Sequence, residues 1–590
     1  MSSETIPARL LRNAEQWPER AAYYVKSDGE WKSTSWAEYA GLVSRAGKAL
    51  IALGFEPGQI VTILGFNRPE WVIMDLAAIA VGGAPAGIYT TSSPDEVQYI
   101  THHAETPLIL VENQEQGEKV RARLGDLPHL RHVVTMSGAL PIGDPMVMTW
   151  EEFLAKGDGV DEARFDERLD ALDPEGLATL IYTSGTTGPP KGVMLTHRNL
   201  TWTADLAQSM VGMSSDDCSV SYLPLSHIAE QIFSIHLPIT CGSKVYFAES
   251  IEALAENLKE VQPTVFFAVP RVWEKFHAGV SARLGEASGA KAAIAKWAMG
   301  VGRKVTRLRN RGGEPRGLAA VQYRLADRLV FSKVREALGL GRVRFAVSGA
   351  APISPEILEF FGGLGLTILE VYGQSEDTGP TSFNVPGHTK FGSVGPPIPG
   401  VEVKIAEDGE ILVKGPNVFS GYYRNDQATS ETLVDGWLHS GDLGEFDDEG
   451  FLDITGRKKD IIITAGGKNV APKNTEAGIK NNALVSEAIV IGDRRKYLTA
   501  LVTLDLEAAE SFAEEHGITG PLHEAPEVVG DIQAVIDEVN AQLARVEQVK
   551  KFCILPRPLS IEDGELTGTL KVRRNVVAEH FAPQIEEMYR

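Results

Sequence analysis

The sequence predicts an α/β protein, and three observations support this prediction. Short β-branched runs alternate with amphipathic stretches along most of the chain, which is typical of buried strands covered by helices; the runs span 60–64, 108–111, 265–269, 343–347 and 367–371. From residue 401 the strands alternate polar and apolar residues between Asp-Gly turns, which predicts a small antiparallel barrel or sheet. Strands at 488–491 and 499–503 with a helix at 531–549 then predict a separate α+β unit.

Length and composition narrow the class of protein. The chain has 590 residues, of which 43% are hydrophobic and 23% charged, so several ordinary globular domains of about 150 residues are expected. A net charge of −22 repels phosphate backbones and excludes a general nucleic-acid-binding role. Cys218, Cys241 and Cys553 show no CxxC spacing, which predicts neither a zinc site nor disulfides and fits a reducing cytoplasm.

No segment predicts a membrane span or a signal peptide. The N-terminus reaches Glu15 and Glu19 without an apolar core, and the best candidate for a membrane span is the uncharged run 76–94. That run contains Gly82, Gly83 and Pro85, which favour a buried helix, turn and strand. We therefore expect a soluble protein.

A polar loop between two apolar strands is the first candidate for chemistry. Residues 177–183 and 193–195 form the predicted strands, and hydroxyl groups, glycines and Lys191 lie between them. The N–H and O–H groups of such a loop can surround phosphate. It is not a Walker A loop, because Pro190 precedes Lys191 and Gly192 follows it. In isolation, the loop is equally consistent with a mobile surface turn.

The loop Ser184-Gly-Thr-Thr-Gly-Pro-Pro-Lys-Gly192 resembles the signature of the adenylate-forming superfamily, which includes acyl-CoA synthetases, luciferases and peptide-synthetase adenylation domains. Four further segments match in the family's order: Val371-Tyr-Gly-Gln-Ser-Glu376, Gly436-Trp-Leu-His-Ser-Gly-Asp442, Gly456-Arg-Lys-Lys-Asp460 and Leu566-Thr-Gly-Thr-Leu-Lys571. The resemblance extends from about residue 20 to the end. Segments 222–227, 269–275, 331–336 and 465–472 are most similar to long-chain fatty acyl-CoA synthetases, including the bubblegum-like branch.

The resemblance implies both an architecture and a reaction. It implies a large N-terminal adenylation domain over residues 1–458, built of two layered α/β subdomains and a small β-barrel. A smaller, mobile α+β domain over residues 459–590 would follow a hinge near Lys459. The implied reaction uses ATP and Mg²⁺ to convert a long-chain fatty acid to acyl-AMP, and CoA then replaces AMP. Joining a carboxylate to a phosphate brings two anions together, so the site must supply cations and aligned donors.

The same resemblance assigns roles to matched positions. Glu376, with Thr183, would ligate Mg²⁺, a cation that prefers oxygen ligands. Lys571 would contact the carboxylate and the bridging phosphate oxygen, and Ser375 replaces the family's usual Thr while keeping a hydroxyl donor; Lys571, Glu376 and Ser375 form the predicted catalytic set. The predicted ATP and AMP site comprises Thr183, Ser184, Gly185, Thr186, Thr187, Lys191, Gly349, Ala350, Ala351, Tyr372, Gly373, Gln374, Asp442 and Arg457.

Within this set, Lys191 and the loop hydroxyls would hold the β- and γ-phosphates. Tyr372 would stack on adenine, and Asp442 would accept hydrogen bonds from both ribose hydroxyls. His227, Gly466 and Gly467 would line the acyl and CoA site, where glycines leave room for a pantetheine arm. A core role for His227 is nearly as consistent with the sequence.

A basic segment interrupts the acidic chain. Between Arg303 and Arg344, twelve basic residues oppose three acidic ones, with apolar residues between them, which predicts a pair of basic amphipathic helices. Three interpretations stay open: peripheral contact with anionic lipid at the inner membrane face, contact with the CoA phosphates, and a solvated helical face.

Two other functions share parts of this pattern. A fatty acyl-AMP ligase that loads a carrier protein would use the same adenylation residues, but it usually carries an insertion near the hinge, and none is visible between Gly450 and Gly467. A non-catalytic lipid- or nucleotide-binding scaffold would have lost Lys571, Glu376 or Asp442, and all three are present. Transfer to CoA is therefore favoured. The oligomeric state, monomer or homodimer, stays open.

Overall fold

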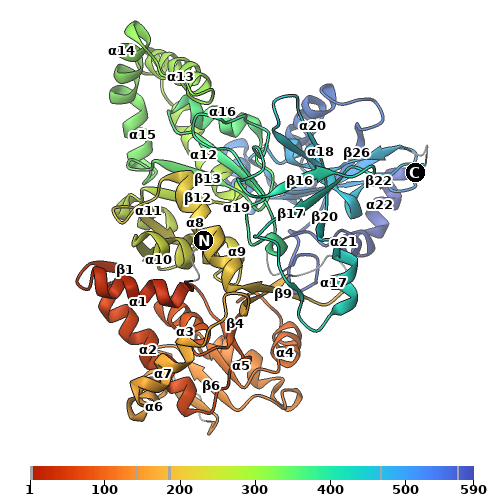
Figure 1. The fold of residues 1–590 in the computed structure, drawn as a ribbon. Helices are drawn as coiled ribbons and strands as arrows, with labels where there is room; N and C mark the ends of the chain where they lie inside the picture. Colours follow the sequence, from red (N-terminus) through yellow and green to blue (C-terminus); the bar gives the residue numbers. More distant parts are fainter. Residues whose placement is uncertain (1–3, 140–143, 184–187, 466–467, 568–570) are drawn as a thin grey trace.

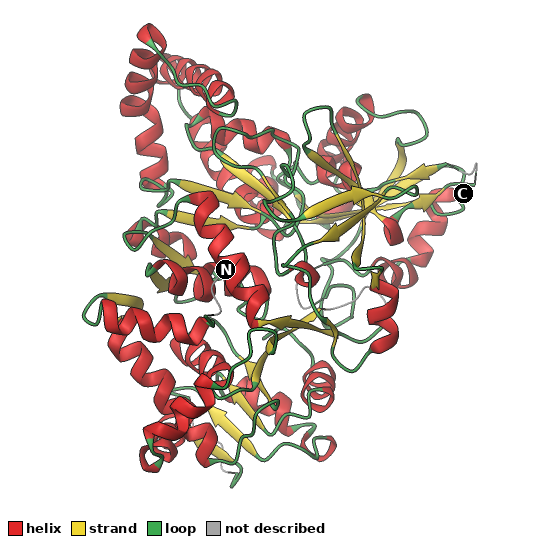
Figure 2. Cartoon of the chain, viewed as in Figure 1, coloured by secondary structure: helices red, strands yellow, loops and turns green. Residues whose placement is uncertain are grey.

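The computed structural model describes residues 4–139, 144–183, 188–465, 468–567 and 571–590, and the chain is mixed α/β, as predicted. Figure 1 shows the segments after residue 459 (blue) beside the sheets that precede them, and Figure 2 shows helices on the outside of several sheets. No helix within the described ranges is long and apolar enough to cross a membrane. The uncharged run 76–94 forms the end of helix α3 (Pro69–Ala80) and strand β4 (Ala84–Ile88).

The largest sheet has eight strands in the order β18-β9-β8-β4-β3-β5-β6-β7. Strands β8 to β7 pair in parallel and β9 pairs antiparallel to both its neighbours. All residues of β3 and β4 are buried, which matches their continuous apolar sequences. The other bounds are β3 (Ile60–Leu64), β5 (Leu108–Val111), β6 (His132–Thr135), β7 (Val147–Thr149), β8 (Leu177–Thr183), β9 (Lys191–Thr196) and β18 (Gly421–Tyr422).

Helices from the first part of the chain accompany this sheet. They begin at polar residues that cap their first turns; Ser93, for example, forms a capping box with Glu96 at the start of α4. The bounds are α2 (Trp36–Ala52), α4 (Pro94–His103), α5 (Gln114–Arg121), α6 (Trp150–Lys156) and α7 (Glu162–Asp170).

Two four-stranded sheets have the orders β10-β11-β1-β2 and β12-β13-β14-β15, and the first of them joins strands from the middle of the chain to β1 and β2 near its start. The runs expected at 265–269, 343–347 and 367–371 form β12 (Val265–Ala268), β13 (Phe345–Ser348) and β14 (Ile368–Tyr372), which pair in parallel. The remaining strands are β1 (Ala21–Ser27), β2 (Glu30–Ser35), β10 (Cys218–Ser221), β11 (Lys244–Phe247) and β15 (Ser382–Phe383). Their helices are α8 (His197–Val211), α9 (Ile228–Gln231), η3 (Ile232–His236), α10 (Leu237–Cys241), α11 (Leu254–Val261), α12 (Pro270–Gly285), α13 (Gly289–Arg309), α14 (Gly317–Ala326), η4 (Asp327–Phe331), α15 (Ser332–Ala337) and α16 (Pro355–Gly363).

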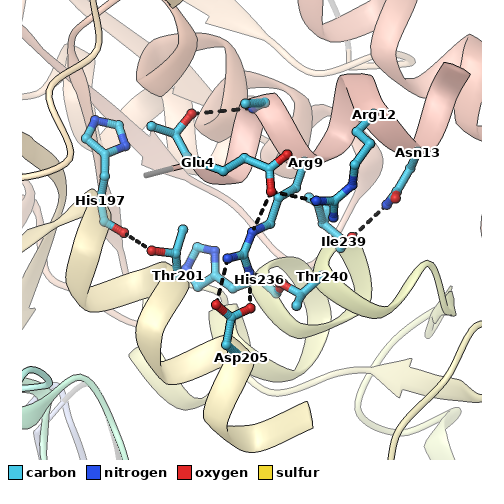
Figure 3. Close-up of polar contacts among 12 residues, drawn as sticks. Glu4, Arg9, Arg12, Asn13, His197, Thr201, Asp205, His236, Ile239 and Thr240 are labelled. Atoms are coloured by element: carbon cyan, nitrogen blue, oxygen red, sulfur yellow. Dashed lines mark hydrogen bonds and ion pairs between the residues drawn. The ribbon is translucent and has the colours of Figure 1, made fainter. Parts of the chain in front are cut away.

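The first helix, α1 (Ile6–Gln16), is joined to α8 and α10 by polar contacts (Figure 3). Arg9 is 2% exposed; its guanidinium lies 2.7 Å from an Asp205 carboxylate oxygen and donates to the Thr240 hydroxyl at 2.8 Å. Asn13 donates to the Ile239 carbonyl at 2.6 Å. A buried charge needs such partners, so these contacts fix α1 against residues more than 190 positions away in the sequence.

An antiparallel sheet follows residue 401, as expected. Its order is β16-β17-β20-β19, with β21 paired to β20. The bounds are β16 (Glu402–Ile405), β17 (Glu410–Lys414), β19 (Leu433–Val434), β20 (Trp437–Phe446) and β21 (Leu452–Arg457), with helix α17 (Asp426–Thr432) before β19. Strand β18, which precedes α17, instead joins the large sheet beside β9.

The last part of the chain forms its own sheet, β24-β25-β26. The helix expected over 531–549 is wrong at its C-terminal end: α20 spans Pro526–Ala541, and β26 begins at Val549. The Asn540 side chain both accepts from the Val549 N–H and donates to its carbonyl, which turns the chain into the strand. The other bounds are η6 (Lys458–Asp460), β22 (Ile462–Ile463), β23 (Asn469–Val470), α18 (Lys473–Ile479), β24 (Val485–Ile491), β25 (Leu498–Leu504), α19 (Leu506–His516), β26 (Val549–Ile554), α21 (Arg574–His580) and α22 (Ala582–Tyr589).

Candidate active site

The turn after β14 brings the residues of the Tyr-Gly-Gln-Ser-Glu motif together. Gly373 has no substitute here, because a Cβ atom at this position would lie 1.6 Å from the Gly379 carbonyl oxygen. Asp377 is fully buried and accepts from the Gln374 N–H at 2.8 Å, and burial raises the pKa of its carboxyl to about 8. Ser375 is buried at the start of the 3₁₀ turn η5 (Ser375–Asp377), and Glu376 beside it is half-buried.

Tyr372, Asp442 and Arg457 form one connected group. The Tyr372 hydroxyl donates to Asp442 Oδ2 at 2.9 Å, and Arg457 Nε donates to Asp442 Oδ1 at 2.9 Å. Burial and then the Asp442 charge raise the pKa of Tyr372, while Asp442 raises the pKa of Arg457. Each carboxylate oxygen has two lone pairs, so both oxygens of Asp442 keep acceptor capacity for a pair of hydroxyls.

Tyr422 connects the polar loop to Glu376. Thr183 and Lys191 are paired at the ends of β8 and β9, and Lys191 Nζ lies 4.7 Å from the centre of the Tyr422 ring. The Tyr422 hydroxyl donates to Glu376 Oε1 at 2.8 Å. Both Lys191 and Glu376 therefore contact one ring on β18. The other predicted loop residues, Ser184, Gly185, Thr186 and Thr187, lie outside the described residues.

The donor set near Glu376 suits Mg²⁺ bound partly by its substrate. Among the described residues, no group of three His, Cys, Asp or Glu side chains could hold a metal ion. Glu376 Oε2 makes no hydrogen bond within that part of the chain, and the Thr183 hydroxyl has one contact, a long 3.5 Å bond to the Lys191 carbonyl. Mg²⁺ commonly takes one or two carboxylates and completes its shell with phosphate oxygens and water, so these residues fit that ion.

Lys571 reaches the same site from the last part of the chain. Residues 566–567 pair with residues 571–572, and we call these paired residues the Lys571 hairpin: the Thr567 N–H donates to the Lys571 carbonyl at 2.8 Å, and Leu566 pairs with Val572. Burial and then the Arg457 charge lower the pKa of Lys571, while Asp442 and Glu376 act in the opposite direction. Lys571 is exposed to solvent, although many protein atoms lie around it. The charges of two carboxylates and one arginine from distant segments therefore act on Lys571.

His227 lies within the electrostatic influence of the same lysine. Its Nδ1 accepts from the Ala229 N–H at 3.2 Å at the start of α9, so the proton of the neutral ring is on Nε2. Burial and then the Lys571 charge lower the pKa of His227 to about 4. The ring is therefore uncharged near pH 7 and within reach of the Lys571 charge, and its role in an acyl site stays a prediction.

The segment after β13 lies one strand from Tyr372. Ala350 has φ 66°, a left-handed backbone that non-glycine residues rarely adopt, and it stands between Gly349 and Ala351. The Ser348 hydroxyl and Gln374 Nε2 are buried and have no hydrogen-bond partner among the described residues. Buried polar atoms normally have partners, so both are available to a bound ligand.

The remaining predicted residues divide into two groups. Lys459 is exposed in the turn η6, directly after Arg457 and Lys458. Gly466 and Gly467 lie outside the described residues.

Sequence reasoning missed Tyr422, Lys473 and a buried network under His227. Lys473 begins α18, and burial lowers its pKa while Asp442 acts in the opposite direction; its position directly after Pro472 of the glycine-containing motif was the available signal. In the network, Asn67 donates to the Leu223 carbonyl at 2.7 Å and to Glu230 at 3.2 Å. These bonds fix the segment that leads to His227.

Comparison with known proteins shows the family of the chain. Residues 10–423 match the AMP-binding enzyme family, and residues 459–590 match its C-terminal domain. The long-chain-fatty-acid–CoA ligase ACSBG2 of Xenopus laevis is 38% identical over 622 residues, covering 99% of this chain and 84% of that protein. The long-chain-fatty-acid–CoA ligase FadD15 of Mycobacterium tuberculosis is 38% identical over 596 residues, covering 99% of this chain and 97% of that protein.

Solved structures share the fold. The adenylation domain of a carboxylate reductase from Mycobacterium chelonae is 22% identical, with a TM-score of 0.76, and covers 100% of this chain and 92% of that one. The anthranilate CoA ligase AuaEII, bound to anthranoyl-AMP, is 20% identical, with a TM-score of 0.73 and 98% coverage of both chains. With a family match over most of its length and relatives this similar along nearly all of it, the chain belongs to the AMP-binding enzyme family.

Proposed function

We propose that this protein is a long-chain-fatty-acid–CoA ligase that forms AMP. The observation that supports this most is that the charges of Arg457, Asp442 and Glu376 act on Lys571, in a chain whose relatives are named long-chain-fatty-acid–CoA ligases. ATP, the fatty acid and CoA are its proposed substrates. The acceptor is CoA rather than a carrier protein, because the named relatives are CoA ligases over nearly the full chain.

The proposed reaction has two steps. In the first, a carboxylate oxygen of the fatty acid forms a bond to the α-phosphorus of ATP, and the bond to the bridging oxygen breaks, releasing pyrophosphate. In the second, the CoA sulfur bonds to the acyl carbon, AMP leaves, and the thiol proton passes to solvent. Both steps need developing negative charge to be stabilised by fixed cations and donors.

Each site residue has a place in the first step. Asp442 accepts from the ribose hydroxyls, and Tyr372, held by its bond to Asp442, packs beside the base. Lys191 and the loop hydroxyls hold the outer phosphates, with Glu376 and Thr183 positioned for Mg²⁺, which would neutralise phosphate charge. Lys571 binds the reacting carboxylate and the bridging oxygen, and neutral His227 donates from Nε2 toward the carboxylate.

The second step requires Lys571 to leave. We assign residues 1–458 to the adenylation domain and residues 459–590 to a mobile domain that turns near Lys459. In the thioester-forming position, Gly466 and Gly467 would replace the Lys571 hairpin and admit the pantetheine arm. The three cysteines are free, which fits a cytoplasmic protein. We also propose that the basic segment 303–344 contacts the inner membrane face.

The test is AMP release that depends on ATP, CoA and fatty acids of increasing length, with each half-reaction measured separately. Lys571→Ala is expected to reduce adenylation about 10²–10³-fold while keeping most thioester formation from supplied acyl-adenylate. Lys550→Ala, an exposed lysine of the same region, is the matched control. Equal loss of both half-reactions in Lys571→Ala would contradict its role, and absence of both adenylate and thioester with every acid would refute the ligase.

A further inference from the structure

Helix α14 carries an apolar stripe on its exposed side. Leu318, Val321 and Leu325 are 72%, 59% and 48% exposed, and Leu329 in η4 is 40% exposed. Their spacing of three, four and four residues places them on one face of the helix. Figure 1 shows α14 with α13 at the upper extremity of the molecule, away from the segments after residue 459. Single exposed apolar residues are ordinary, but a contiguous stripe marks an interaction surface.

Arginines without acidic partners flank this stripe. Arg316, Arg324 and Arg328 are exposed and form no ion pair within the described residues. Other arginines of the same segment are paired: Arg309 with Glu314 at 3.2 Å and Arg335 with Asp327 at 2.7 Å. Three cations therefore stand free beside the apolar face, in a chain whose overall charge is −22.

The combination favours one class of partner over the others. The CoA phosphates would account for the arginines but not for four exposed aliphatic side chains. In a dimer with two-fold symmetry, the arginines of one copy would lie close to the same arginines of the other copy, and their charges would repel. A contact between two copies without two-fold symmetry would leave an open assembly rather than a closed dimer. An anionic bilayer satisfies both features, because acyl chains receive the leucines and phosphate headgroups receive the arginines.

We propose that α14 and η4 lie in the surface of an anionic membrane, with Leu318, Val321, Leu325 and Leu329 inserted between headgroups and Arg316, Arg324 and Arg328 on lipid phosphates. This inference rests on the membrane contact included in the proposed function and assigns that contact to named residues of α14 and η4. The surface is separate from the predicted catalytic residues, so membrane binding does not require the proposed reaction. If the reaction also holds, the helix keeps the enzyme where its water-insoluble acid substrate dissolves.

Co-sedimentation with vesicles tests this surface. Wild-type protein is expected to bind vesicles of phosphatidylcholine with 30% phosphatidylserine at least tenfold more tightly than vesicles of phosphatidylcholine alone, and less tightly as salt rises. The triple variant Arg316→Glu, Arg324→Glu, Arg328→Glu is expected to lose about 100-fold, since each basic residue contributes about fivefold near such a surface. The triple variant Leu318→Gln, Val321→Gln, Leu325→Gln is expected to lose about tenfold or more on both vesicle types.

Matched controls separate this surface from global effects. Arg545→Glu, Lys550→Glu, Lys551→Glu makes the same charge change at exposed sites elsewhere, and Ile251→Gln, Val434→Gln, Val546→Gln removes three other exposed apolar side chains. Both controls are expected to bind vesicles as the wild type does. Equal losses in controls and test variants would overturn the proposal.

Solution mass and activity complete the test. If wild-type protein sediments as a dimer, and the α14 apolar variant is a monomer with unchanged vesicle binding, the stripe is an interface between copies and the proposal is wrong. Adenylation of a short, soluble acid is expected to be unaltered in the α14 variants, which distinguishes failure of membrane binding from failure of the proposed ligase function.

Discussion

Two ion pairs join the segment after residue 459 to the rest of the described chain. We expect one of them to favour the position of Lys571 in the site over a position outside it. Arg573 Nη2 lies 3.1 Å from Glu96 Oε1, and Arg271 pairs with Asp505. Arg573 is two residues from Lys571, so its bond to α4 holds the hairpin in the site. Glu96→Gln is the selective perturbation, because Gln at this position retains the capping box with Ser93 and removes only the charge.

The size of the effect follows from burial. The side chains of Arg573 and Glu96 are 28% and 25% exposed, so the pair is stronger than a fully exposed one, which is worth about 0–1 kcal/mol. A contribution of about 1 kcal/mol changes the ratio of docked to undocked hairpin about fivefold. We therefore expect Glu96→Gln to slow adenylation about two- to fivefold, and to leave thioester formation from supplied acyl-adenylate unchanged or faster.

The assay measures pyrophosphate exchange and thioester formation side by side. Glu96→Gln, Arg573→Gln and the double variant form a cycle with an expected coupling of about 1 kcal/mol, and high salt should reduce it. Glu115→Gln, an exposed carboxylate on the next helix, is the control. Zero coupling, or equal slowing of both half-reactions, would refute the idea that this pair holds Lys571 in place.

Three further predictions concern single groups. Tyr422→Phe keeps the ring under Lys191 but loses the bond to Glu376; adenylation is expected to fall about tenfold, with a higher Mg²⁺ requirement, and an unchanged rate across an Mg²⁺ titration would contradict this. Glu565→Gln should lower the free energy of unfolding by up to about 3 kcal/mol at pH 7, because hydrogen bonds from Arg557 outweigh burial and lower the pKa of Glu565 to about 2. In the wild-type protein, this stabilisation is present above about pH 4.5 and is lost as the pH falls toward 2. Urea titrations at several pH values measure it. Burial lowers the pKa of His236 to about 3, so as the pH falls this histidine is protonated in the unfolded chain before it is protonated in the folded one. Its contribution to the free energy of unfolding therefore falls by about 1.4 kcal/mol per pH unit below about pH 6.5. In His236→Leu, the free energy of unfolding should fall less steeply between pH 6.5 and 5.

Local pattern was sufficient for the elements and the motif positions. The buried runs expected at 60–64 and 108–111 are β3 and β5, and the predicted Tyr372 and Asp442 are joined by a hydrogen bond. The helix expected to continue to 549 was wrong, because its end depends on the Asn540 side chain rather than on hydrophobic periodicity.

Contacts between distant segments could not be predicted in the same way. Tyr422 contacts Glu376 because the two-residue strand β18 pairs with β9 of the large sheet. The strands on either side of β18 in the sequence belong to a different sheet. A strand this short has no periodicity to detect. Glu96 and Arg573 are 477 residues apart, and nothing in either segment marks the other as its partner. The motifs therefore indicate candidate ligand-binding residues, and the sheet topology decides which other residues contact them.

The charges around Lys571 offer a physical reason for the proposed movement of its hairpin. Burial and Arg457 both disfavour the Lys571 cation here, and Asp442 and Glu376 offset this only in part; Lys473 adds another cation near Asp442. In the proposed reaction, bound ATP brings several negative charges and makes the docked hairpin favourable. Once pyrophosphate leaves, that attraction drops while the repulsion between Lys571 and Arg457 stays. In the proposed reaction, we therefore expect release of pyrophosphate to favour departure of the hairpin, so that electrostatics within the site would set the order of the two half-reactions.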